Sequence, residues 1–158
     1  MGLAEYEPWN EARATAIVTA RAREEGAMLP ILHDVQAAFG CVPLAAVPLI
    51  AGVLNLSRAE VHGIVTFYHD FRRSPPGRHI LRLCRAEACQ SRGADALADH
   101  ARAALGCDWH ETTADGAVTL EPVFCLGLCA IGPNALLDGE PLARLNPARL
   151  AAALEGAS

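Results

Sequence analysis

The feature that most constrains the fold is a set of four cysteines arranged as two pairs, each placed after a strand-like segment. The apolar segment "HILRLC" ends at Cys84, and Cys89 follows after four intervening residues. A second strand-like segment, "GAVTLEPVF", leads into "CLGLC", which holds Cys125 and Cys129 with three residues between them. Ligand-binding residues of α/β folds lie beyond the carboxyl ends of strands. We therefore expect the two pairs to meet at one edge of a sheet.

Three kinds of site use four cysteines in such an arrangement. A [2Fe–2S] cluster takes four thiolates and, because it contains two irons, needs them spread more widely than one ion does. A structural zinc ion also takes four thiolates, although zinc pairs favour two intervening residues. Disulfides or inert buried thiols are the third alternative. The spacing favours the cluster and leaves the other two readings open.

The residues beside the cysteines suit a negatively charged centre. The start of the helix expected after Cys89 would direct backbone N–H groups and a positive dipole end toward it. Arg85 and Arg92 lie close in sequence and would add positive potential. Gly127 lets the backbone turn so that N–H groups face a sulfur. The apolar residues of the second loop would exclude water.

Composition narrows the class of protein. The chain has 158 residues and a net charge of −5, which argues against nucleic acid as the main partner. No apolar run reaches the roughly 18 residues that a membrane-spanning helix needs, and the N-terminus lacks the pattern of a signal peptide. We therefore expect a cytoplasmic protein whose thiols stay reduced. Cys41 and Cys107 lie outside the paired pattern and are predicted to be buried bystanders.

The first 72 residues are predicted to form a small helical bundle. Asn10 can cap a helix that runs to Glu25, and Pro30 suits the first position of a helix that ends before Gly40. Another helix is expected to start near residues 44–45, and the capping box "SRAE" that begins at Ser57 opens a fourth. Two prolines and a glycine make residues 73–77 a stiff linker.

Residues 78–158 are predicted to form an α/β domain. After the first cysteine pair, apolar residues at helical spacing predict a helix that Gly106 ends. "NALLDGEPLARL" indicates a hairpin that turns at Asp138 and Gly139. Asn146 begins a final helix that runs through Leu154. Strand, helix, strand, hairpin and helix together form a small α/β layer.

Three segments resemble a known family. "LCRAEACQSRG", "CLGLCAIGPNALLDGE" and "EVHGIVTFYHDF" are similar to the thioredoxin-like [2Fe–2S] ferredoxin subunits of NADH-linked oxidoreductases. That family includes the 24-kilodalton subunit of respiratory complex I and subunits of NAD-reducing hydrogenases and formate dehydrogenases. The resemblance runs from about Met28 to Leu154. It implies a thioredoxin-like domain after the helical bundle, with the cluster ligands being Cys84, Cys89, Cys125 and Cys129.

Within this family, "CRAEACQ" and "FYHDFR" look most like the gamma subunit of soluble NAD-dependent molybdenum formate dehydrogenases. That resemblance implies a partner subunit that binds FMN and NAD(H) and, through it, a molybdenum formate dehydrogenase catalytic subunit. The chain itself has no G-x-G-x-x-G or P-loop pattern, so it would carry electrons without a catalytic site of its own. The alternatives are the equivalent subunit of complex I or of a hydrogenase, a free-standing ferredoxin, and a zinc-stabilised interaction module.

Overall fold

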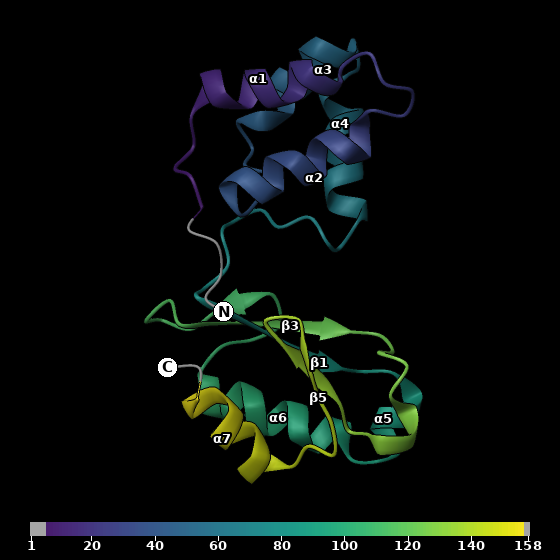
Figure 1. Ribbon diagram of the computed structural model, residues 1–158, viewed down its shortest axis with the longest axis vertical. Helices are drawn as coiled ribbons and strands as arrows, with labels where there is room; N and C mark the ends of the chain where they lie inside the picture. Colours follow the sequence, from purple (N-terminus) through teal and green to yellow (C-terminus); the bar gives the residue numbers. More distant parts are fainter. Residues whose placement is uncertain (1–5, 157–158) are drawn as a thin grey trace. The chain divides into compact units, whose positions relative to one another are not determined.

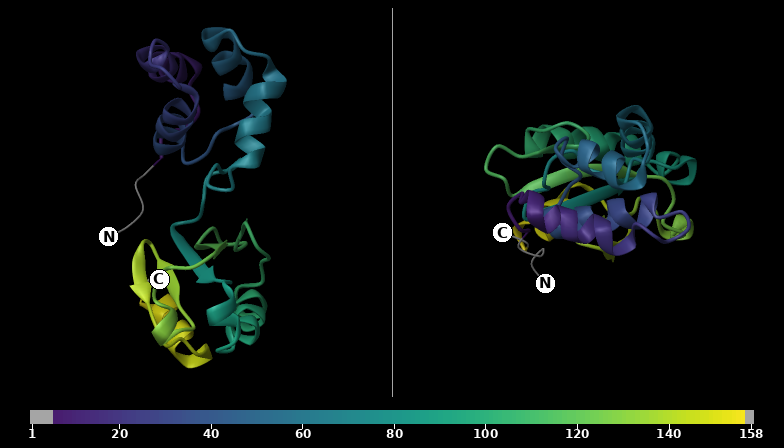
Figure 2. Two further views of the ribbon diagram at one scale, coloured as in Figure 1. Left: turned by 90° about the vertical axis from the view of Figure 1, so that its right-hand side faces the viewer. Right: turned by 90° about the horizontal axis from the view of Figure 1, so that it is seen from above.

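The computed structural model describes residues 6–156, and the chain divides into two compact units between Pro75 and Pro76. Figure 1 labels most of the elements, and in Figures 1 and 2 the first unit is coloured from purple to teal and the second from teal through green to yellow. The predicted linker, residues 73–77, contains the point of division. Among the described residues, no helix is long and apolar enough to cross a membrane.

The first unit is a bundle of four helices around its own apolar core. The helices are α1 (Glu11–Arg21), α2 (Met28–Phe39), α3 (Ala46–Leu54) and α4 (Arg58–Phe67). Apolar side chains at helical spacing are buried between them, and they include Val18, Ile31, Leu32, Val35, Phe39, Ile50 and Val61. None of the four paired cysteines belongs to this core. The predicted helical bundle is therefore confirmed.

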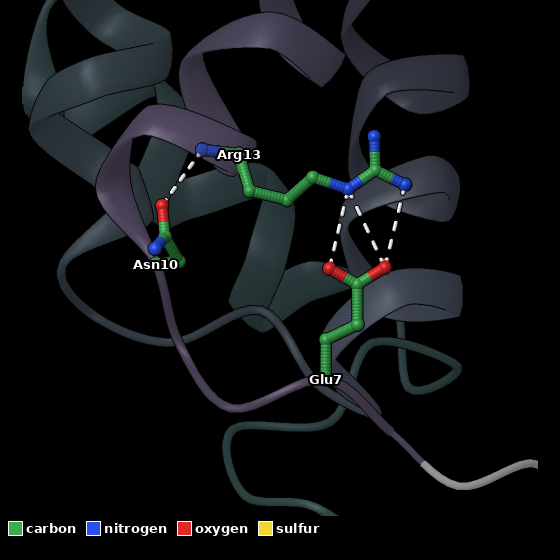
Figure 3. A network of polar contacts seen from close by, with 3 residues as sticks. All are labelled: Glu7, Asn10 and Arg13. Carbon is green, nitrogen blue, oxygen red and sulfur yellow. Dashed lines mark hydrogen bonds and ion pairs between the residues drawn. The ribbon is translucent and has the colours of Figure 1, made fainter.

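The start of α1 follows its predicted capping signal, whereas its end does not. The Asn10 side chain accepts a hydrogen bond from the Arg13 backbone N–H at 2.9 Å, and the Arg13 guanidinium pairs with Glu7 (Figure 3). The helix ends at Arg21, four residues before the predicted Glu25. None of residues 22–26 is buried against the bundle, so no packing extends the helix there.

The other helix boundaries lie within a few residues of those predicted. The capping box is present, because Ser57 accepts the Glu60 N–H and Glu60 reaches back to the Ser57 N–H. Pro30 occupies the third position of α2 rather than the first, and Pro48 occupies the third position of α3. Both prolines still fall within the first turn, where a backbone N–H has no partner inside the helix and its absence costs little.

The second unit is a five-stranded mixed sheet with helices packed on one face. The strand order is β2 (Glu111–Thr112), β3 (Val118–Val123), β1 (His79–Cys84), β4 (Ala135–Leu137) and β5 (Glu140–Leu142). Helices α6 (Ala94–Leu105) and α7 (Pro147–Glu155) share one core with the sheet. Its most buried side chains are Leu81, Leu83, Ala98, Ala101, Leu120, Ala135 and Leu150. The predicted α/β class is confirmed, and the two-residue strand β2 is an addition to it.

The sheet register places the candidate site. Strands β1 and β3 are parallel, and Cys84, the last residue of β1, lies opposite Val123, the last residue of β3. Their carboxyl ends therefore reach the same edge. The short helix α5 (Glu87–Gln90) follows β1, and the 3-10 helix η1 (Cys129–Ile131) follows the loop after β3. Figure 1 shows α5 beside this loop at that edge.

Candidate metal centre

The four predicted ligands come together as two pairs of thiols. Cys84 at the end of β1 interacts through its thiol with Cys89 in α5. The Sγ atoms of Cys125 and Cys129 are 3.6 Å apart. Negative charge on Cys84 also helps to raise the pKa of Cys129, so the two pairs are near enough for their thiolates to repel each other. Within residues 6–156, no group of three or more His, Cys, Asp or Glu side chains is arranged around a single metal-ion position.

The two pairs differ in exposure. Cys84 and Cys89 are 2% and 1% exposed, respectively, whereas Cys129 is half-buried and Cys125 is exposed. Small and apolar side chains pack around the buried pair, namely Ala86, Ala94, Val123 and Leu126. The centre is therefore sheltered on the side of the sheet and accessible on the side of the second loop.

Backbone N–H groups converge on the sulfur of Cys84. Burial acts to raise the pKa of this thiol, but hydrogen bonds from the Ala86 N–H, from Cys89 and from the N–H groups of Cys125 and Leu126 outweigh it. The pKa of Cys84 therefore lies below its ordinary value, which favours the thiolate that a metal requires. These donors come from both loops, so the ends of β1 and β3 together build the environment of one sulfur.

Cys89 and Cys129 resist ionisation, Cys89 chiefly because it is buried and Cys129 chiefly because Cys125 adjoins it. Burial, followed by the neighbouring Cys84, raises the pKa of Cys89, and the backbone N–H of Asn134 opposes this rise. The adjacent Cys125 raises the pKa of Cys129. Four thiolates in this space therefore need compensating positive charge, which the irons of a cluster supply. Two sulfur pairs with N–H donors aimed at one of them fit a [2Fe–2S] cluster.

An unusual backbone conformation shapes the second loop. Gly127 has φ of 76°, as its predicted role requires, but Cys125 also lies in the left-handed region with φ of 72°. This conformation costs a residue with a side chain about 1–2 kcal/mol. It accompanies the turn that directs the N–H groups of Cys125 and Leu126 toward Cys84. Nothing in the sequence marks Cys125 for this conformation.

Arg85, in the first cysteine loop, has a carboxylate partner that was not predicted from the sequence. Arg85 forms an ion pair with Asp95 at 2.8 Å, and its guanidinium lies 5.4 Å from the centre of the Trp109 ring. Asp95 therefore offsets part of the positive potential predicted for Arg85. Both cysteines outside the pattern are buried, as predicted, and burial raises the pKa of Cys41 and of Cys107.

Comparison with known proteins decides the family. Residues 14–158 match the family model described as thioredoxin-like [2Fe–2S] ferredoxin. The chain belongs to this family. Membership implies a [2Fe–2S] cluster as the cofactor, and it confirms both the predicted resemblance and the predicted fold class. The match covers the helical unit from Ala14 onward as well as the sheet.

The relatives are components of oxidoreductases. The E subunit of NADH-quinone oxidoreductase from Pseudomonas aeruginosa is 37% identical over 129 residues, which make up 82% of this chain and 78% of the relative. Its counterpart from Escherichia coli is 36% identical over the same shares. The HndA component of the NADP-reducing hydrogenase from Solidesulfovibrio fructosivorans is 27% identical over 81% of this chain and 75% of its own.

A solved structure of an NAD+-reducing [NiFe]-hydrogenase in its air-oxidized state also matches. The TM-score is 0.66 and the identity 28%, over 82% of this chain and 22% of the hydrogenase chain. The present chain thus spans about a fifth of the length of that structural neighbour. The architecture therefore also occurs as one part of a longer oxidoreductase chain.

Proposed function

We propose that this chain is an electron-transfer subunit that holds one [2Fe–2S] cluster on Cys84, Cys89, Cys125 and Cys129. The observation that carries the proposal is the pairing of these four thiols at the coincident ends of β1 and β3, where backbone N–H groups point to Cys84. Family membership supports the identity of the cofactor.

Each part of the chain has a distinct task in this proposal. A bound [2Fe–2S] cluster supplies one-electron transfer. The four thiolates hold it, and N–H groups from Ala86 and Leu126 stabilise negative charge at a sulfur. Val123 and the other apolar neighbours of Cys84 exclude water on the inner side. The exposed second loop leaves an open side from which an electron can enter or leave.

The proposed partner is a subunit that binds FMN and NAD(H). The relatives are subunits of an NADH-quinone oxidoreductase and of an NADP-reducing hydrogenase, which supports a nicotinamide-linked complex. Phe124, next to Cys125, is 72% exposed and gives the open side an apolar side chain that a partner would cover. Electrons would pass between the flavin of that subunit and this chain. All six cysteines are free of disulfide bonds. Such thiols suit a cytoplasmic location for the complex, because the cytoplasm keeps thiols reduced.

The finer proposal is an NAD-dependent molybdenum formate dehydrogenase, with this chain as its gamma subunit. Its support is the first cysteine loop, "CRAEACQ", and the segment "FYHDFR". The equivalent subunit of complex I or of an NAD-reducing hydrogenase fits the relatives equally well. Affinity purification of the full chain from its native cells distinguishes these complexes by the metal and cofactor content of what is retained. Molybdenum and a flavin subunit are expected, whereas nickel, a quinone-reducing membrane complex or no flavin subunit would contradict the finer proposal.

A metal analysis of the full chain, purified without oxygen, tests the main proposal. We expect about two irons and two acid-labile sulfides per chain, visible absorption, and an EPR signal after reduction with dithionite. The zinc-stabilised module is the alternative of a different class. A colourless, EPR-silent chain that holds one zinc ion and no sulfide would establish that alternative and exclude electron transfer.

A further inference from the structure

One buried polar residue of the site is not among the four proposed ligands. Asn134 is 2% exposed and lies immediately before β4. Its backbone carbonyl accepts the Cys84 N–H at 3.0 Å, and its backbone N–H donates to the sulfur of Cys89. The main chain of Asn134 is therefore fixed between the two buried cysteines.

The orientation of the Asn134 amide follows from its contacts. Its Nδ2 atom donates to the carbonyl oxygen of Leu128 at 2.7 Å, and a carbonyl can only accept. The opposite orientation would set two oxygens against each other. The same Nδ2 lies 3.7 Å from Cys89 Sγ, within hydrogen-bonding range of a sulfur. One amide group thus bridges the first cysteine pair and the backbone between Cys125 and Cys129.

The other end of this amide is unpaired. The Oδ1 atom of Asn134 is buried and has no hydrogen-bond partner among residues 6–156. A buried polar atom without a partner costs free energy, and a leucine of similar volume would avoid that cost. Packing alone therefore does not account for an asparagine here. Its donor end, aimed at Cys89, is the part that a leucine could not replace.

Gly132 packs closely against both the Cys89 sulfur and the Asn134 amide. A Cβ atom on Gly132 would lie 3.2 Å from Cys89 Sγ and 3.7 Å from Asn134 Nδ2. The absence of a side chain at Gly132 leaves room for the sulfur and the amide together.

We infer that Asn134 is a positioning residue whose side-chain N–H raises the reduction potential of the cluster through Cys89 and ties the two cysteine loops together. The inference rests on the proposed function. Reduction adds negative charge to the centre, and a hydrogen-bond donor at a ligating sulfur stabilises the more negative state. The donor thus favours the reduced form over the oxidised form.

The variant Asn134→Leu removes the donor while it keeps the backbone contacts and much of the volume. In the full chain with the cluster bound, we expect the ratio of reduced to oxidised cluster at a fixed potential to fall on the order of tenfold. For a one-electron couple, this corresponds to a fall of about 59 mV in the reduction potential. The matched control is Val123→Ala, which changes packing beside the same cysteines without removing a donor. Because this control admits water, its potential should stay or rise. An unchanged potential in Asn134→Leu, or an equal fall in both variants, would overturn the inference.

A second measurement does not depend on the variant's folding. Wild-type chain labelled with ¹⁵N only in asparagine side chains should show a weak ¹⁵N coupling in pulsed EPR of the reduced state. The coupling should disappear in any loaded Asn134→Leu sample. A loaded wild type without this coupling rejects the role of Asn134 alone. A wild type without iron and sulfide rejects the proposed function, and the inference with it.

Discussion

At the scale of single residues, the proposed ligands make the most direct prediction. Replacing Cys125 by Ser should remove or weaken the cluster, because a hydroxyl is a poorer ligand for iron than a thiolate. Metal binding and folding are coupled, so the melting temperature should also fall, by roughly 5 °C or more. Visible absorption and thermal melting measure the two effects. Cys41→Ala is the control, since Cys41 lies in the helical unit, and it should keep its cluster. A normal spectrum and melting curve for Cys125→Ser would contradict the ligand assignment.

Phe124 permits a test of the open side. The variant Phe124→Ser should leave iron content and EPR signal unchanged, because the side chain is 72% exposed. Binding to the flavin subunit should weaken about tenfold or more, as expected for an aromatic anchor in an interface. Titration calorimetry with the purified partner measures this change. Ala151→Ser, on the exposed surface of α7, should bind as the wild type does. Equal affinity of both variants would place the interface elsewhere.

The sequence could identify some residues of the site and not others. Cys84, Cys89, Cys125 and Cys129 were predictable as candidate ligands, because paired thiols at defined spacing after strands favour a metal site. Asn134 was not, because its importance depends on contacts with a residue 45 positions away. Its one local signal is a polar side chain between a proline and the apolar start of β4.

At the scale of elements, the capping box of α4 makes a prediction with a pH dependence. Hydrogen bonds from Ser57 hold the pKa of Glu60 below its ordinary value. The Glu60 carboxylate therefore stabilises the fold at pH values above the pKa that it has in the unfolded chain. This stabilisation is lost as the pH falls through the lower pKa that Glu60 has in the folded chain. Ser57→Ala should cost about 1 kcal/mol of unfolding free energy at neutral pH.

Denaturant unfolding at pH 7 and at pH 3, followed by a spectroscopic signal from the helical unit, measures this change in unfolding free energy. The difference between wild type and Ser57→Ala should shrink at the lower pH, because protonation weakens the Glu60 contact in the wild type. Arg58→Ala, an exposed neighbour, should show a small difference at both values. A difference that grew toward acid pH would contradict the assigned pKa direction.

Elements with strong local signals were the predictable ones. The hairpin turn has Asp138 with φ of 52° and Gly139 with φ of 88°, a combination that an Asp-Gly pair adopts readily. In contrast, β2 contains two polar residues, and α5 spans four. Such short elements have no periodicity to detect and form because neighbouring segments hold them. For α5, the neighbouring segment includes the cysteine site itself.

At the scale of the whole molecule, the two units have separate cores. The buried residues of the helical unit form one cluster, whereas those around the sheet and around Cys84 and Cys89 form others. The proposed metal ligands belong only to the second unit. Metal binding should therefore stabilise the units unequally, since the free energy of binding acts on the part that forms the site.

Removal of the cluster tests this unequal dependence. After treatment with a chelator and reductant, amides of β1, α5 and β3 should exchange hydrogen markedly faster, because the thiols at their ends lose the charge that holds them together. Amides inside α1–α4 should keep their protection, since their core contains none of the four thiols. Hydrogen-exchange mass spectrometry resolves the two sets of peptides, and reconstitution with iron and sulfide should restore the first. Simultaneous loss of protection in both sets would mean that the cluster stabilises the chain as one cooperative unit.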